Sequence, residues 1–229
     1  MEAVKLTKLS NTGLASQQAM ACFTCATCAS GCPATGIDGL DPRKLVRMAV
    51  LGMEEDLVSA RWPWICTMCG RCDHLCPMGV KISDLVRNIR SLRGREDVPG
   101  TLHKGVSTAL KTGNNFGIPK ADFVFIMEDV AEEFAEEEGL DDFEMPLDKR
   151  DADILCTVHG KLPFGQTDDM KFWWKIFYAA KESWTVPSEN WEGVNWALYT
   201  GDDAAMKTMV GRIVENMEKL NAKNLLFPE

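Results

Sequence analysis

The sequence predicts an α+β protein, in which a mainly helical part is followed by a smaller α/β part built on a parallel sheet. Two observations predict the helical part: two cysteine-rich motifs are joined by helical sequence, and apolar residues repeat at helical spacing up to Gly113. In the α/β part, short apolar runs alternate with helical stripes from Ala152 onward. We therefore expect a helical domain at 1–113, a connector at 114–150 and an α/β subdomain at 151–229.

Three helices are predicted in the first part. One begins at Asp41 and Pro42, which are favoured residue types for an N-cap and a first helical position. Another follows the second cysteine motif, and a third runs from Thr101 to Gly113, where glycine ends it. Their apolar stripes are Leu45, Met48, Ala49 and Gly52, then Ile82, Leu85, Val86, Ile89 and Leu92, and finally Leu102, Val106, Ala109 and Leu110.

The connector is predicted from its charge. Residues 128–144 carry ten carboxylates and few hydrophobic anchors. Runs of like charge are usually solvated, so we expect an acidic surface segment with no specific partner.

The α/β part follows the order strand, helix, strand, helix, strand. The strands are predicted at ADILCTV (152–158), SWTV (183–186) and NLLF (224–227). The helical stripes between them are Met170, Trp173, Trp174 and Phe177, and then Met206, Met209, Val210, Ile213, Met217 and Leu220. This order normally builds a parallel sheet.

The composition indicates a globular protein that stays in the cytoplasm. The chain has 229 residues and a net charge of −9, which argues against nucleic acid as a partner. The first twenty residues lack the apolar run of a secretory signal, and the run FVFIM at 123–127 is far below the roughly 20 residues of a membrane span. Nine cysteines in a reducing compartment are expected to be ligands or catalytic thiols rather than disulfides.

Eight of these cysteines form two copies of the spacing C-x2-C-x2-C-x3-C, each followed by proline. Zinc sites commonly place a dozen or more residues between two C-x2-C pairs, whereas three thiolates at successive x2 spacing suit three corners of a cubane cluster. We therefore predict two 4Fe–4S clusters, with a structural zinc-binding protein as the alternative. The copies are Cys22, Cys25, Cys28 and Cys32, and Cys66, Cys69, Cys72 and Cys76.

The fourth cysteine of each motif is expected to ligate the other cluster, as in two-cluster ferredoxins. The two clusters must then lie close together, so that electrons can pass from one cluster to the other. By this rule one cluster is held by Cys22, Cys25, Cys28 and Cys76, and the other by Cys66, Cys69, Cys72 and Cys32.

Four other residues invite a functional interpretation. Cys156 lies in mid-strand, where a free cysteine is usually a small buried hydrophobe. His159 and Lys161 follow that strand at the edge where parallel sheets bind ligands, and His74 lies between two ligand cysteines, which favours a second-layer or surface role. We assign no catalytic residue, and the common glycine-rich nucleotide-binding motifs do not occur.

The motifs, separated by 33 residues, resemble the ferredoxin-type iron–sulfur part of heterodisulfide reductase C and D subunits. The stretches HGKLPFG, SWTVPSENWEGVNWALYTGDDAAM and NLLFPE resemble HdrD-like subunits of the DsrK, HmcF and TmcB type, which occur in membrane redox complexes of sulfate reducers. In that family a C-terminal domain with Cys-Cys-Gly motifs carries a further cluster that acts on disulfides. This sequence contains no Cys-Cys-Gly, so we expect 151–229 to be a partial domain of that CCG-like type and the chain to continue beyond Glu229.

The resemblance implies an electron-transfer subunit of an oxidoreductase complex, peripheral on the cytoplasmic side of the inner membrane. It would relay electrons between a membrane quinone or cytochrome complex, with b-type and c-type cytochrome subunits as partners, and a cytoplasmic thiol/disulfide acceptor. The alternative within this class is the C-type subunit of a soluble heterodisulfide reductase complex, in which another chain performs the disulfide chemistry.

Overall fold

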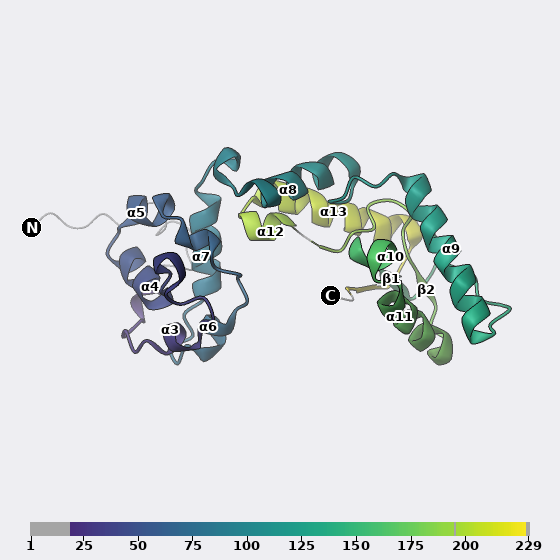
Figure 1. The fold of residues 1–229 in the computed structure, drawn as a ribbon, viewed down its shortest axis with the longest axis horizontal. Helices are drawn as coiled ribbons and strands as arrows, with labels where there is room; N and C mark the ends of the chain where they lie inside the picture. The colour runs from purple at the N-terminus through teal and green to yellow at the C-terminus, as the bar shows by residue number, and fades with distance from the viewer. Residues whose placement is uncertain (1–18, 195, 228–229) are drawn as a thin grey trace, which may run out of the picture. The chain divides into compact units, whose positions relative to one another are not determined.

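The computed structural model describes residues 19–194 and 196–227. The chain forms two compact units. One comprises the described residues up to His103 together with Ala197–Asp203, and the other comprises Lys104–Trp196 and the residues from Ala204 onward. Figure 1 shows the helices of both units and the short strands of the second.

The first unit is helical. Its second-longest helix, α4, begins where the sequence predicts, because Asp41 Oδ1 accepts hydrogen bonds from the backbone N–H groups of Arg43 (2.9 Å) and Lys44 (3.2 Å). The elements are α3 (Thr27–Gly31), η1 (Ile37–Gly39), α4 (Pro42–Val50), α5 (Glu54–Ser59), η2 (Trp62–Trp64), α6 (Arg71–Leu75), α7 (Ile82–Ser91) and η3 (Arg95–Asp97).

The core of the first unit lies between α4, α5 and α7. The predicted apolar stripe of α7 is confirmed, because four of its five residues are buried there. Burial of this stripe fixes the position of the segment that follows the second cysteine motif. The buried core residues are Ala19, Cys28, Leu45, Val46, Leu57, Val80, Ile82, Leu85, Val86 and Ile89.

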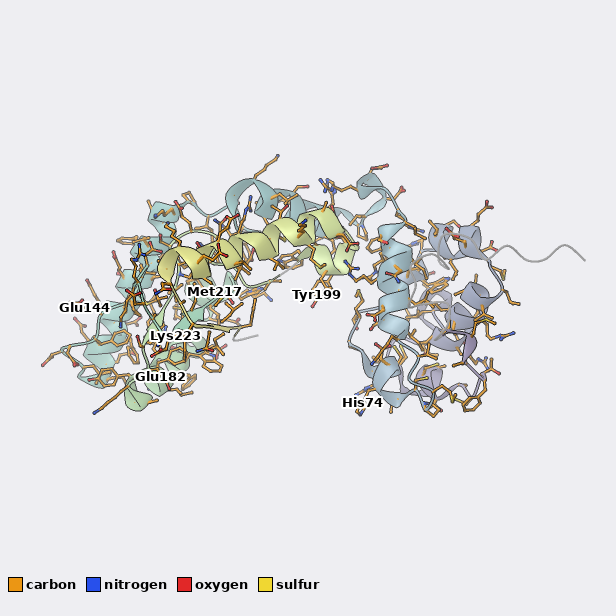
Figure 2. The ribbon with its side chains drawn as sticks, turned by 180° about the vertical axis from the view of Figure 1, so that it is seen from behind. His74, Glu144, Glu182, Tyr199, Met217 and Lys223 are labelled. Carbon is orange, nitrogen blue, oxygen red and sulfur yellow. The ribbon has the colours of Figure 1, made fainter. Side chains whose placement is uncertain are left out.

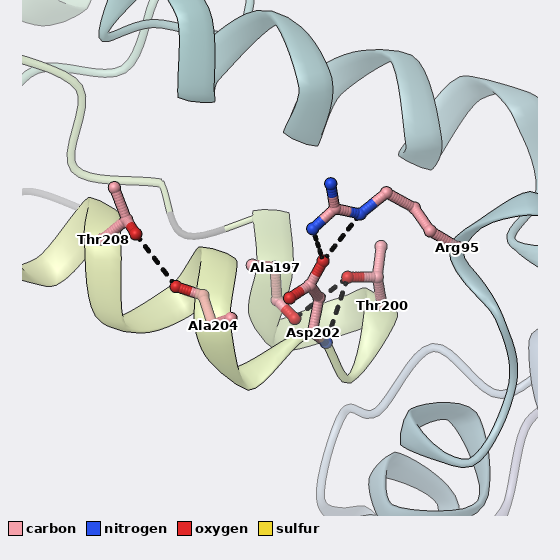
Figure 3. Close-up of polar contacts among 6 residues, drawn as sticks. All are labelled: Arg95, Ala197, Thr200, Asp202, Ala204 and Thr208. Carbon is pink, nitrogen blue, oxygen red and sulfur yellow. Dashed lines mark hydrogen bonds and ion pairs between the residues drawn. The ribbon is translucent and has the colours of Figure 1, made fainter.

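A segment distant in sequence, Ala197–Asp203, also belongs to the first unit. Gly201 (φ 75°) passes so close to α7 that a Cβ there would lie 2.6 Å from the backbone nitrogen of Ser91. Two hydrogen bonds from Arg95 to Asp202 hold the segment beside α7, one of them 2.9 Å long (Figure 3). The first unit therefore does not coincide with the expected domain at 1–113, because segments far apart in sequence complete it.

The second unit contains the predicted parallel sheet. Its strand order is β2-β1-β3, with Leu155 opposite Thr185 on one side and Leu225 on the other. Sequential strands are connected through helices, as parallel pairing requires. The elements from Gly100 onward are α8 (Gly100–Thr112), α9 (Lys120–Glu138), β1 (Ile154–Cys156), α10 (Lys161–Gly165), α11 (Thr167–Ala180), β2 (Trp184–Thr185), α12 (Trp196–Thr200), α13 (Asp203–Leu220) and β3 (Asn224–Leu226).

Helix α9 differs from the expected solvated connector. It forms part of the core of the second unit, and Phe123 stacks on Trp191 with the ring centroids 4.3 Å apart. The carboxylates lie on the opposite side of the same helix, which hid this stripe in the sequence. The buried residues of α9 are Phe123, Met127, Val130, Ala131 and Phe134.

Among the described residues, no helix combines the length and the apolar character needed to cross a bilayer.

Replacing Phe123 with alanine should strongly destabilise the second unit. Phe123 is 0% exposed, so the change leaves a cavity beside Trp191 and is expected to cost about 3–5 kcal/mol. The matched control is Phe125→Ala on the same helix, because Phe125 is 64% exposed and its loss should change the stability by no more than about 0.5 kcal/mol. Urea unfolding of the full chain measures both variants, and equal losses would show that α9 is not packed as described.

Candidate metal centres

The two cysteine motifs follow the same backbone course. In each, the residue before the second cysteine and the residue after it adopt left-handed conformations, and a short helix, α3 or α6, then carries the third cysteine. A left-handed conformation costs a residue other than glycine about 1–2 kcal/mol. Such strain is typical of segments shaped for a function. The left-handed residues are Thr24 (φ 64°), Ala26 (φ 66°), Met68 (φ 55°) and Gly70 (φ 72°).

The two motif helices pack against each other. Gly31 occupies the position in α3 that Leu75 occupies in α6, and a Cβ on Gly31 would lie 2.1 Å from Leu75 Cδ1. Glycine in one copy therefore makes room for the leucine of the other. The fourth cysteines, Cys32 and Cys76, directly follow these helices in extended conformation.

Two cavities lie at the motifs, and each is lined by four cysteines. Three cysteines of each cavity come from one motif and the fourth comes from the other. We call them the Cys22 site, lined by Cys22, Cys25, Cys28 and Cys76, and the Cys66 site, lined by Cys66, Cys69, Cys72 and Cys32.

The walls of both sites are largely apolar. Val46 and Val80 line the Cys22 site, and Leu40 and Val86 line the Cys66 site. Ile82, at the start of α7, lines both. The two cavities are therefore neighbours with one side chain in common.

The cysteine thiols differ in their electrostatic surroundings. Burial raises the pKa of Cys28 and of Cys66. It raises the pKa of Cys72 to about 12, and the carboxylate of Asp73 adds to this effect. Metal ligation requires thiolates, so the buried thiols need a compensating positive charge in order to ionise.

The two exposed thiols behave in the opposite way. At Cys25, the hydroxyl and backbone N–H of Thr27 lower the pKa by hydrogen bonding. At Cys69, the backbone N–H of Arg71 has the main effect on the pKa, in the same direction. Each site thus combines partly or fully buried thiols with one solvent-exposed thiol whose pKa is lowered.

These surroundings suit a thiolate-bound iron–sulfur cluster. Each site offers four thiols in an apolar cavity, and backbone N–H groups point at the sulfur atoms, with Met68 N 3.4 Å from Cys66 Sγ and Val80 N 3.3 Å from Cys76 Sγ. Such N–H···S contacts tune cluster potentials. Across residues 19–194 and 196–227, no three His, Cys, Asp or Glu side chains are arranged around a single metal ion. The thiols are instead distributed over the cavity walls.

Arg90, on α7, is a site residue that the sequence reasoning missed. It is 3% exposed, and its guanidinium donates hydrogen bonds to the carbonyl oxygens of Pro63 (2.7 Å), Cys66 and Tyr199 (2.7 Å). The guanidinium also lies over the ring of Trp64, 4.9 Å from its centroid. Its burial could have been predicted from the sequence, because residue 90 lies four positions after Val86 and eight after Ile82, on the same face of the helix.

The other candidate residues lie apart from the cavities. His74 is an exposed residue of α6 and lines neither site (Figure 2). Cys156 belongs to the core of the second unit, where burial raises its pKa to about 12 and keeps the thiol protonated. The Nδ1 atom of His159 accepts a hydrogen bond from the backbone N–H of Lys161 (2.9 Å), at the start of α10.

Comparison with known proteins supports the cluster interpretation. Residues 18–80 match the family described as 4Fe-4S dicluster domain. The chain is 34% identical, over 43% of its length, to the C subunit of the H(2):CoB-CoM heterodisulfide,ferredoxin reductase of Methanothermobacter marburgensis, covering 52% of that protein. It is 30% identical, over 41% of its length, to the iron-sulfur C subunit of the CoB--CoM heterodisulfide reductase of Methanopyrus kandleri, covering 50% of it. The chain is also similar to the C subunit of the Ferredoxin/F(420)H(2)-dependent CoB-CoM heterodisulfide reductase of Methanosarcina acetivorans. The identity is 29% over 46% of this chain, which covers 62% of that protein.

The chain thus spans about half the length of the first relatives that it matches. The part that carries the cysteine motifs is a 4Fe–4S dicluster domain, and this chain is similar to the C subunits of heterodisulfide reductases.

Proposed function

We propose that the chain binds two 4Fe–4S clusters with crossed ligands. The Cys22 site would hold one cluster and the Cys66 site the other. The observation that carries this proposal is the composition of the two cavities, each of which draws its fourth cysteine from the opposite motif. The ligands would be Cys22, Cys25, Cys28 and Cys76 for the first cluster, and Cys66, Cys69, Cys72 and Cys32 for the second.

In this role the protein supplies distance, burial and charge. A bound 4Fe–4S cluster accepts and releases single electrons, and the organic chemistry of any substrate takes place elsewhere. The apolar walls exclude water, and Ile82 keeps the two sites adjacent. The proposal assigns no acid, base or nucleophile to this chain.

We propose further that the chain is an electron-transfer subunit of a heterodisulfide reductase-type complex. The similarity to C subunits supports this, because their names place them in reductases that act on the CoB-CoM heterodisulfide. This chain would act as a component of an oxidoreductase and deliver electrons to the subunit that reduces a disulfide.

Two assemblies fit this role. The similarity to C subunits favours a C-type role in a heterodisulfide reductase complex, the alternative in which another chain performs the disulfide chemistry. The stretches HGKLPFG and SWTVPSENWEGVNWALYTGDDAAM, outside the dicluster match, favour a DsrK-type complex on the cytoplasmic side of the inner membrane. There the second unit would be a partial CCG-like domain, and the chain would exchange electrons with a membrane quinone pool through cytochromes. Co-purification of b-type or c-type cytochromes with the native protein would distinguish the second assembly from the first.

Anaerobic reconstitution with iron and sulfide should produce a brown protein with about eight iron and eight sulfide per chain. Dithionite should bleach the colour, because each cluster accepts an electron. Metal and sulfide analysis together with the visible spectrum provide the measurement. A colourless chain that binds zinc and no sulfide would contradict the proposal and favour the structural zinc alternative.

Cys32→Ser should disturb the cluster held by the second motif. The reason is that Cys32 lines the Cys66 site although it is the last cysteine of the first motif. EPR spectra of the reduced protein should show a changed signal from the Cys66-site cluster and a retained signal from the Cys22-site cluster.

Two variants serve as controls for this experiment. Cys76→Ser should produce the reverse pattern, because Cys76 lines the Cys22 site. Cys156→Ser should leave both signals unchanged, because Cys156 lies in the core of the second unit. The crossed assignment is wrong if Cys32→Ser alters the signal that depends on Cys22, Cys25 and Cys28.

A further inference from the structure

Arg90 is a buried cation beside one of the two sites. Its guanidinium donates to the carbonyl oxygen of Cys66 and approaches Met68 Sδ at 3.1 Å, so it touches the loop that carries two ligands of the Cys66 site. The acceptors of Arg90 are neutral, and within the part of the chain that the structure describes no carboxylate forms an ion pair with it. Arginine keeps its charge in proteins, so the first unit holds an uncompensated positive charge at this point.

Two further charged residues, of opposite sign, act on thiols of the Cys66 site. Arg71 lines the cavity and acts on the thiol of Cys69, while Asp73 acts on the thiol of Cys72. The Asp73 carboxylate also accepts hydrogen bonds from the backbone N–H and the hydroxyl of Ser83, which keeps it in place. The charges of Arg71 and Asp73 therefore offset each other to first order. The positive charge of Arg90 is left without such an offset.

The Cys22 site has the pair without the additional cation. Arg43 is the one charged residue that lines this cavity within residues 19–194 and 196–227, and it lies 3.6 Å from the carboxylate of Asp41. Asp41 in turn acts on the thiol of Cys28. The Arg43 side chain is 46% exposed, so water screens its charge more than that of Arg90.

We propose that Arg90 makes the Cys66 site the one with the higher reduction potential. The proposal rests on the two clusters proposed above. One-electron reduction adds one negative charge to a cluster, and a buried cation beside it stabilises this more negative state. Transfer between the sites then oxidises the Cys22-site cluster by one electron and reduces the Cys66-site cluster by one electron, with no proton required. Electrons that enter at the Cys22 site would therefore collect at the Cys66 site.

The test is a potentiometric titration of the reconstituted full chain, followed by EPR. In the unmodified protein, the signal that depends on Cys32 should appear first as the potential is lowered. Arg90→Gln should lower the equilibrium constant for reduction of that cluster at least tenfold, which lowers its reduction potential by about 59 mV for one electron. The reduction potential of the other cluster should shift less. Arg90→Lys keeps the charge, so the reduction potential of that cluster should stay close to its value in the unmodified protein.

Arg93→Gln is the matched control. Arg93 also donates to backbone carbonyls in the first unit, those of Val58 and Ala60 (2.6 Å to the latter), but neither acceptor residue lines a site, whereas Arg90 contacts Cys66 and Met68, which do. Loss of the Arg93 guanidinium should lower the stability of the chain and leave both reduction potentials unchanged. Equal shifts in the Gln and Lys variants of Arg90, or equal shifts of both clusters, would overturn the proposal, because the effect would then not come from a local charge.

The order of reduction in the unmodified chain decides the question even where Arg90→Gln fails to fold. If the signal that depends on Cys76 appears first, Arg90 does not set the order and the inference is wrong. A chain that takes up no iron and sulfide would instead remove the proposed function itself. The two failures are thus distinguished by the cofactor content measured before the titration.

Discussion

The contact between α3 and α6 is the interaction on which both candidate sites depend. Each helix carries the third cysteine of its own motif and ends at the fourth. Because Gly31 lies directly against Leu75, the two helix ends come close enough for Cys32 and Cys76 to line the cavity of the opposite motif. A larger residue at Gly31 would push against Leu75 and separate the halves. The absence of a side chain at Gly31 therefore determines whether the two cysteine loops act as one structure.

The symmetry of the motifs is accompanied by an asymmetry around them. The backbones of the two loops repeat each other, including their left-handed residues. Their surroundings differ, because Phe23 and Met78 are exposed at the Cys22 site while their counterparts in the other copy are Thr67 and Ala34. Arg90 lies beside the Cys66 site. The Cys22 site therefore has an apolar rim, and the Cys66 site has a buried cation next to it. Two equal clusters bound in such surroundings would acquire unequal potentials, which is what directed electron transfer requires.

Local signals in the sequence predicted much of the fold. Asp41 and Pro42 mark the start of α4 because capping depends on adjacent residues, and the stripe from Ile82 to Ile89 marks α7 because one face of that helix is buried. The parallel sheet followed from the alternation of strands and helices. The same cysteines that the spacing groups together line the two cavities, while their role as cluster ligands stays a prediction.

Other features depend on contacts that the sequence alone does not reveal. The carboxylates of α9 concealed the stripe from Phe123 to Phe134, because charge along a helix and burial of its other face are compatible. The attachment of Ala197–Asp203 to the first unit depends on the fit of Gly201 against α7, a contact between residues far apart in sequence. Arg90 was missed because an arginine on a buried stripe finds its acceptors only once the loop at Pro63 and Cys66 is in place.

The account depends on two clusters held side by side by crossed ligands, and the EPR spectrum of the fully reduced protein tests this most directly. Two reduced clusters separated by little more than a shared side chain, Ile82, should interact magnetically, so their signals should broaden or split relative to the one-electron-reduced sample. A spectrum equal to the sum of two independent signals would contradict the account, because it would place the clusters too far apart for crossed ligation.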